Sequence, residues 1–127
     1  LRGEIVCPGD KSVSQRIVII GSLLNCEMYI TGFLNAHDPI STVSALNSIG
    51  ASISINGSQA IMKKREIMFK DPQKELNLGN SGTGARLLLG LISGLSLRSK
   101  IETHPLIKRF SYTVIGKWIY RLWSAVK

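Results

Sequence analysis

Cysteine is scarce in this sequence, and its two copies are far apart. Cys7 and Cys26 form neither a CxxC motif nor a spacing typical of metal ligands. Two free thiols are the default in a reducing compartment, so we expect a cytoplasmic protein without a disulfide framework. No long apolar stretch follows a basic start, so no signal peptide is expected. The longest charge-free apolar window, residues 87–97, is too short to span a bilayer.

Acidic residues are also few. Eight Asp and Glu face 16 Lys and Arg, which gives a formal net charge of +8. Such a balance favours anionic partners, whether phosphorylated metabolites, nucleic acid or an acidic membrane face. The hydrophobic share of 44% is enough for a packed core and argues against a disordered chain. A length of 127 residues suits one domain, or an incomplete piece of a larger one.

Apolar periodicity and turn signals divide the chain into short strands and helices. The first half is expected to hold a strand at 3–7, a helix from a cap at Ser12 or Ser14 to about Leu24, a strand at 27–31 and a helix at 40–49 stopped by Gly50. A hairpin of 51–55 with 59–63 is expected around Asn56-Gly57. A strand at 66–69 and an apolar helix after 79–86 are expected to follow. This order predicts a mixed α/β (α+β) fold.

An internal repeat supports this reading. Gly9 is followed seven residues later by Arg16 and then by IVIIGSLL, whereas Gly79 is followed seven residues later by Arg86 and then by LLLGLISGL. The two blocks lie 70 residues apart. That period is longer than solenoid repeats have, so we interpret the blocks as two copies of one α/β unit.

The first block, PGDKSVSQR at residues 8–16, combines a turn with cations at the start of an apolar helix. Unpaired N–H groups and the helix dipole favour an anion there, and Lys11, Ser12 and Arg16 can hold a carboxylate or a phosphate. The alternative is a helix cap with two solvated cations, and composition alone leaves the two equally weighted.

The second block, GNSGTGAR at residues 79–86, has three glycines in six residues. Such a loop lets backbone approach a ligand closely and can form an anion-binding nest. It is neither a Walker A loop nor a GxGxxG fingerprint. The alternative is a turn kept tight for helix packing.

The two histidines, Asp38 and a basic trio have ordinary interpretations. His37 and His104 have no partner at catalytic or ligand spacing, so surface or capping roles are expected. Asp38, before Pro39, is expected to cap the second helix. The basic trio at 63–65 is typical of a solvated turn.

The end of the chain differs in composition. No acidic residue follows Glu102, and most of the aromatic residues lie beyond it: Phe110, Tyr112, Trp118, Tyr120 and Trp123. Together with its lysines and arginines, this predicts a basic, aromatic, helical tail over 101–127. It can be an amphipathic binding element or a helix whose apolar face belongs to a core.

Together, PGDKSVSQR at 8–16, GFL at 32–34 and GNSGTGAR at 79–86 resemble the N-terminal part of EPSP synthase (3-phosphoshikimate 1-carboxyvinyltransferase). The resemblance covers residues 1–95 well and 101–127 loosely. Ser12 stands where the related UDP-N-acetylglucosamine enolpyruvyl transferases have asparagine. The resemblance implies repeated βαβαββ-type units, present here as about one and a half units of a single N-terminal domain fragment.

The resemblance also implies an activity: transfer of enolpyruvyl from phosphoenolpyruvate to the 5-hydroxyl of shikimate 3-phosphate, in aromatic amino acid biosynthesis. No metal or organic cofactor and no nucleic acid partner are implied. Lys11 would contact both substrates as the catalytic residue, and Ser12 and Arg16 would hold shikimate 3-phosphate. Phosphoenolpyruvate, or the inhibitor glyphosate, would face Lys11 and a further set of residues. That set is Asn80, Ser81, Gly82, Thr83 and Arg109.

Length is the main departure from that family. Its enzymes are several times longer, have two domains, and draw their acid/base carboxylates from the second. We therefore expect a complementary C-terminal domain to be needed for full activity. The alternatives are a non-catalytic anion-binding module that uses the basic tail for an acidic partner, and a truncated product.

Overall fold

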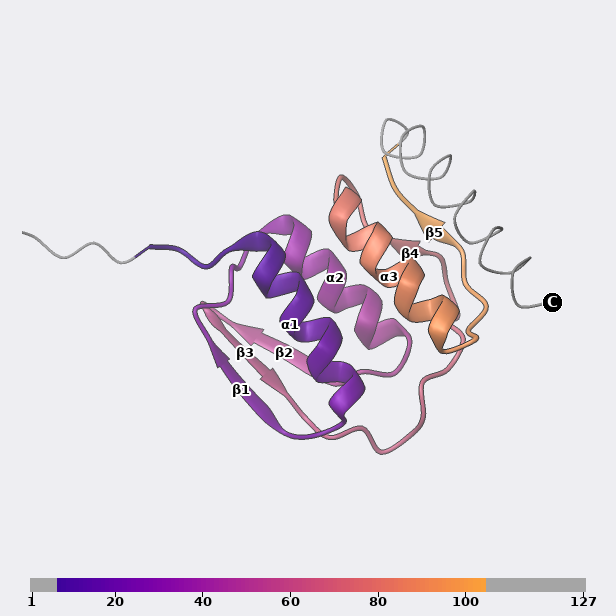
Figure 1. Cartoon of the computed structure of the whole chain (residues 1–127), viewed down its shortest axis with the longest axis horizontal. Helices are drawn as coiled ribbons and strands as arrows, with labels where there is room; N and C mark the ends of the chain where they lie inside the picture. Colours follow the sequence, from indigo (N-terminus) through magenta and orange to yellow (C-terminus); the bar gives the residue numbers. More distant parts are fainter. Residues whose placement is uncertain (1–6, 105–127) are drawn as a thin grey trace, which may run out of the picture.

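The computed structural model describes residues 7–104, which form three helices and two small sheets (Figure 1). The helices are α1 (Lys11–Leu24), α2 (His37–Ser48) and α3 (Gly82–Gly94). The strands are β1 (Met28–Thr31), β2 (Ile53–Asn56), β3 (Gln59–Met62), β4 (Leu76–Asn77) and β5 (Ile101–Glu102). The predicted mixed α/β class is confirmed. The strand expected at 3–7 falls almost wholly outside the described residues.

The first sheet is antiparallel, with strand order β1-β3-β2. The predicted hairpin joins β2 to β3, and Gly57 takes a φ of +57° in the turn, a conformation that side chains with a Cβ disfavour. Ala60 lies opposite Ile30 on one neighbour and opposite Ile55 on the other. Because alternate residues point to one face, Ile30, Ile53 and Ala60 are buried with the helices.

The helices α1 and α2 contact each other and this sheet. A Cβ on Gly21 would come within 2.8 Å of the Met62 sulfur, so the missing side chain lets α1 lie close to β3. Val18, Phe33 and Leu46 are among the most deeply buried side chains of the core.

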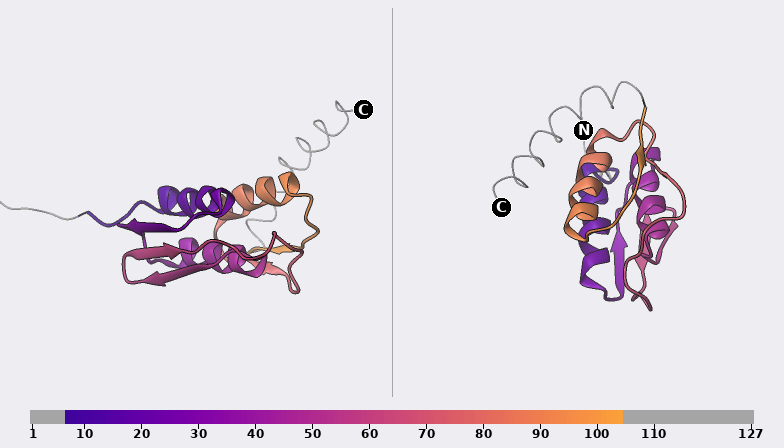
Figure 2. Two further views of the ribbon diagram at one scale, coloured as in Figure 1. Left: turned by 90° about the horizontal axis from the view of Figure 1, so that it is seen from below. Right: turned by 90° about the vertical axis from the view of Figure 1, so that its right-hand side faces the viewer.

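The second sheet pairs β4 with β5 in parallel, with α3 between them in the chain. Helix α3 contacts both α1 and α2. In the two views of Figure 2, α1 and α3 lie in one layer and α2 lies in another. All three helices begin at the same end of the molecule in Figure 1, which brings their N-termini together.

The start of α1 differs from the prediction in its cap. Asp10, rather than Ser12 or Ser14, is the N-cap, and its carboxylate accepts from the Val13 N–H at 2.7 Å. Ser14 is buried, and its hydroxyl accepts from the Leu34 N–H at 3.0 Å. The serine therefore ties α1 to the loop before α2.

The expected cap of α2 is also wrong. The helix begins three residues earlier than predicted, and its N-cap, Ala36, offers no side-chain hydrogen bond. Asp38 lies inside the first turn instead. Gly50 follows the helix with a φ of +112°, as a stop signal would.

No strand forms at 66–69 among the described residues, contrary to the prediction. Met68 is largely exposed, and the guanidinium of Arg65 lies 3.9 Å from the centre of the Phe69 ring. A short apolar segment makes a strand only where a neighbouring strand can receive its hydrogen bonds, and this segment instead crosses from one sheet to the other.

Candidate functional site at three helix starts

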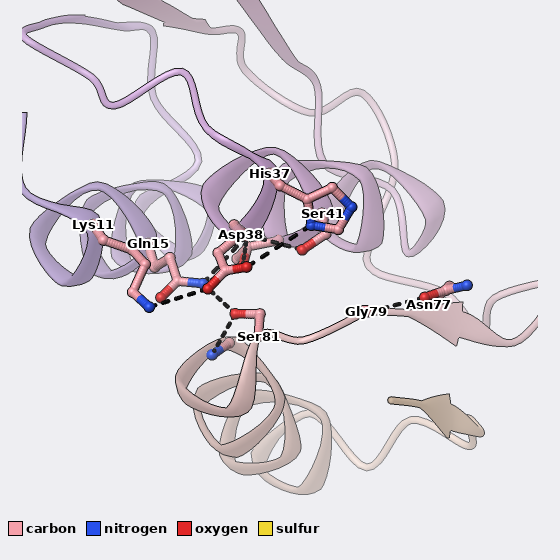
Figure 3. A network of polar contacts seen from close by, with 10 residues as sticks. Lys11, Gln15, His37, Asp38, Ser41, Asn77, Gly79 and Ser81 are labelled. Atoms are coloured by element: carbon pink, nitrogen blue, oxygen red, sulfur yellow. Dashed lines mark hydrogen bonds and ion pairs between the residues drawn. The ribbon is translucent and has the colours of Figure 1, made fainter. Parts of the chain in front are cut away.

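The side chain of Gln15 lies where the starts of the three helices meet (Figure 3). It is fully buried. Its Nε2 lies 3.3 Å from the Asp38 carbonyl and 3.0 Å from the Thr42 hydroxyl, both on α2. It also donates to the hydroxyl of Ser81, the N-cap of α3, at 2.7 Å. One side chain of α1 thus connects the first turns of α2 and α3.

Gly84 makes this junction possible. A Cβ at this position would lie 2.6 Å from the Ser81 hydroxyl, 2.8 Å from that of Thr42 and 2.9 Å from the Gln15 amide nitrogen. These distances are well inside van der Waals contact, so a larger residue fits only if these buried side chains shift. For Gly84, tight helix packing is a sufficient explanation.

Lys11 reaches the same junction from the first turn of α1. Its ammonium lies 3.1 Å from a carboxylate oxygen of Asp38. A cation at a helix N-terminus is unfavourable, and the carboxylates of the N-cap Asp10 and of Asp38 on α2 offset its charge. The Lys11 side chain is 50% exposed, and an ion pair so open to solvent is weak. An arriving anion can therefore compete for the ammonium.

The other cationic and polar residues of the first block lie on the same helix. Ser12 is half-buried and Arg16 is exposed. Arg16 makes no hydrogen bond or ion pair with another residue of 7–104, and Lys11 is paired only with Asp38 there. The charge that the sequence predicts for anion binding is thus open to solvent at the start of α1.

The Gly-rich loop supplies the start of α3. Asn80 is exposed, and Gly82 and Thr83 are half-buried. Ser81 is buried, and its hydroxyl oxygen accepts from both the Gly84 N–H and Gln15. The Ser81 side chain thus serves the junction. Arg109 lies outside the described residues.

An open pocket of about 340 Å³ adjoins this loop. Its lining residues are His37, Asn77, Gly79, Asn80, Glu102, Thr103 and His104. Both histidines line this pocket because the backbone N–H of His104 donates to the Gly79 carbonyl at 2.8 Å, and because His37 lies over Gly79. The sequence does not indicate this pocket, since no spacing along the chain links the two histidines.

Within residues 7–104, no three His, Cys, Asp or Glu side chains are grouped so as to hold a metal ion. No helix in the same range has the length and apolar character to cross a membrane.

Comparison with known proteins identifies the family. The family model of EPSP synthase (3-phosphoshikimate 1-carboxyvinyltransferase) matches residues 1–105. The chain belongs to the EPSP synthase family. Among its relatives, the 3-phosphoshikimate 1-carboxyvinyltransferase of Petrotoga mobilis is 45% identical over 103 residues, which are 80% of this chain and 24% of that protein. The enzyme of that name from Oenococcus oeni is 41% identical over 116 residues, 90% of this chain and 26% of that protein.

The fold agrees with this membership. A solved structure of EPSP synthase from Acinetobacter baumannii matches with a TM-score of 0.70 and 30% identity, covering 81% of this chain and 24% of that one. The chain therefore spans about a quarter of the length of the EPSP synthases that it matches.

Proposed function

We propose that the starts of α1 and α3 form one half of an EPSP synthase-type site, which binds shikimate 3-phosphate and phosphoenolpyruvate. The observation that carries this proposal is the junction at Gln15, which joins the helix bearing Lys11 to the cap of the Gly-rich loop at Ser81. Two polar blocks far apart in the sequence thus share one end of the molecule. Both substrates are multiply anionic, and helix starts with cations offset their repulsion and orient them.

The first block has the role of holding shikimate 3-phosphate. Ser12 and Arg16 would bind its shikimate moiety, since a guanidinium can form two parallel hydrogen bonds with a carboxylate. Lys11 would contact both substrates as the catalytic residue. Its weak pairing with Asp38 supports this role, because the ammonium can exchange one carboxylate for another anion at little cost.

The second block has the role of facing phosphoenolpyruvate, with glyphosate as a competitor. Asn80, Gly82 and Thr83 would present backbone and side-chain donors, and Ser81 would act through its backbone while its hydroxyl holds the junction. Arg109 remains a proposed ligand of the same substrate.

The reaction is enolpyruvyl transfer in aromatic amino acid biosynthesis, in the cytoplasm. The 5-hydroxyl oxygen of shikimate 3-phosphate bonds to the central carbon of phosphoenolpyruvate, the hydroxyl proton leaves, and the C–O bond to phosphate breaks. This chain, about one and a half α/β units, spans about a quarter of the length of its relatives. The carboxylates that move protons would come from the remaining part of such an enzyme, in a complementary C-terminal domain.

An exposed apolar stripe on α1 supports the need for such a partner. Val13, Ile20 and Leu24 are each more than half exposed, and Ile17 is only partly buried. Their spacing places all four on one face of the helix. An apolar face of this length is unusual on a surface that stays solvated, and it fits a surface that the complementary domain covers.

The test of the proposed site is a titration of the ¹⁵N-labelled chain with shikimate 3-phosphate and with glyphosate. We expect amide shifts in residues 11–16 and 79–86. Absence of shifts in both segments with both ligands would contradict the site. An assay of phosphate release, with and without a fragment carrying the remaining family sequence, tests the reaction separately.

A further inference from the structure

We propose that Gln15 is a positioning residue that fixes the Lys11 block relative to the Gly-rich loop; this inference rests on the proposed function of those two blocks. Its Nε2 lies within 3.3 Å of three acceptors on two other helices. Lys11, one turn earlier on α1, pairs with the carboxylate of the same Asp38 whose carbonyl faces Gln15. The Gln15 side chain thus contacts both Asp38, which is the partner of Lys11, and Ser81, which is the cap of α3.

Each of the three acceptors that face the Gln15 Nε2 also has a hydrogen-bond partner other than Gln15. The Thr42 hydroxyl donates to the Asp38 carbonyl at 3.1 Å. That carbonyl also accepts from the Ser41 hydroxyl at 2.9 Å, and the Ser81 oxygen accepts from the Gly84 N–H at 3.1 Å. Each of these three acceptors therefore has a hydrogen-bond partner on its own helix. What Gln15 adds is the connection between helices.

That connection has a cost. The other polar atom of the side chain, Oε1, is buried and has no hydrogen-bond partner within residues 7–104. A buried acceptor left unpaired is destabilising, and native proteins contain few of them. An apolar side chain of the same length would avoid this cost and fill the same space. What glutamine provides here, and an apolar side chain would not, is the connection between the two binding blocks.

Gln15→Met separates these explanations, because methionine keeps the length and removes both the connection and the unpaired acceptor. Ser22→Ala is the matched control. Ser22 is also buried on α1, but its hydroxyl bonds only within the helix, to the Ile19 carbonyl. Each variant is compared with the parent chain by thermal unfolding, by amide spectra, and by titration with shikimate 3-phosphate.

We expect Gln15→Met to keep or raise the melting temperature. We expect it to shift the amides of residues 81–84 and to weaken binding about tenfold, the scale of one buried hydrogen bond. Ser22→Ala should leave those amides and the affinity unchanged.

The inference is overturned if Gln15→Met moves the 81–84 amides no more than Ser22→Ala does. It is also overturned if the methionine variant unfolds or loses its melting transition, since Gln15 would then serve the fold. A parent chain that binds no shikimate 3-phosphate would contradict the proposed function, while the ligand-free amide comparison still decides the role of Gln15.

Discussion

The ammonium of Lys11 lies 3.1 Å from the carboxylate of Asp38, and this pair joins the first turn of α1 to the first turn of α2. The lysine is half exposed, and the aspartate is mostly covered. The cation is therefore the partner that can turn toward a ligand, while the carboxylate stays with α2. Binding of an anion at Lys11 then competes with Asp38.

Replacing Lys11 by methionine should abolish binding while leaving the fold intact. An ion pair this exposed contributes at most about 1 kcal/mol to the free energy of unfolding. Calorimetric titration with shikimate 3-phosphate should show loss of binding, and thermal unfolding should change little. Lys64→Met is the control, because Lys64 is an exposed lysine after β3. Equal losses in the two variants would mean that only overall charge matters.

Replacing Asp38 by asparagine should strengthen anion binding. The substitution removes the carboxylate that competes for Lys11, and an exposed pair of about 0.2–1 kcal/mol corresponds to a gain of about 1.4- to fivefold in affinity. The same titration measures it. A fall in affinity would show instead that the carboxylate is needed to hold the lysine in place.

Two glycines of α3 should respond to alanine in opposite ways. Gly84→Ala places a methyl group within 3 Å of three polar atoms and should destabilise the fold by about 1–3 kcal/mol, the usual cost of overpacking. Gly90→Ala meets no neighbouring atom and should stabilise the helix by about 0.5–1 kcal/mol. Urea unfolding measures both. A neutral Gly84→Ala would mean that the three helix starts are not tightly packed.

The apolar stripe on α1 should matter only when the complementary domain is present. Ile20→Gln changes a side chain that is 56% exposed, so the melting temperature of the chain alone should stay the same. Phosphate release on mixing with a fragment carrying the rest of the family sequence should fall. Ser48→Gln, at an exposed position of α2, is the control. Unchanged complementation by Ile20→Gln would place the partner elsewhere.

Local patterns predicted the elements that depend on local interactions. The apolar run of α1 and the Asn56-Gly57 turn each contain the information for their own conformation. The strand expected at 66–69 failed because a strand also needs a neighbour, and here Phe69 packs under Arg65 instead.

The candidate site likewise contains residues that the sequence indicates and residues that only the structure reveals. Lys11, Arg16 and the Gly-rich loop stand out in the sequence because cations and glycines cluster there. Gln15 and the charge pairing of Asp38 do not, because their partners are Ser81 and Lys11, many residues away. Asp10 takes the capping role expected of Ser12 or Ser14 because both residue types can cap a helix, and Ser14 instead accepts from the Leu34 N–H, which is distant in the sequence.

The central claim is that the Lys11 block and the Gly-rich loop bind one set of anionic substrates together. The most direct measurement is an amide titration of the chain with shikimate 3-phosphate, followed by addition of glyphosate, with inorganic phosphate as the control ligand. We predict shifts in residues 11–16 with shikimate 3-phosphate, further shifts in residues 79–86 with glyphosate, and loss of both sets in Lys11→Met. Shifts that inorganic phosphate reproduces in full, or that persist in Lys11→Met, would contradict the claim.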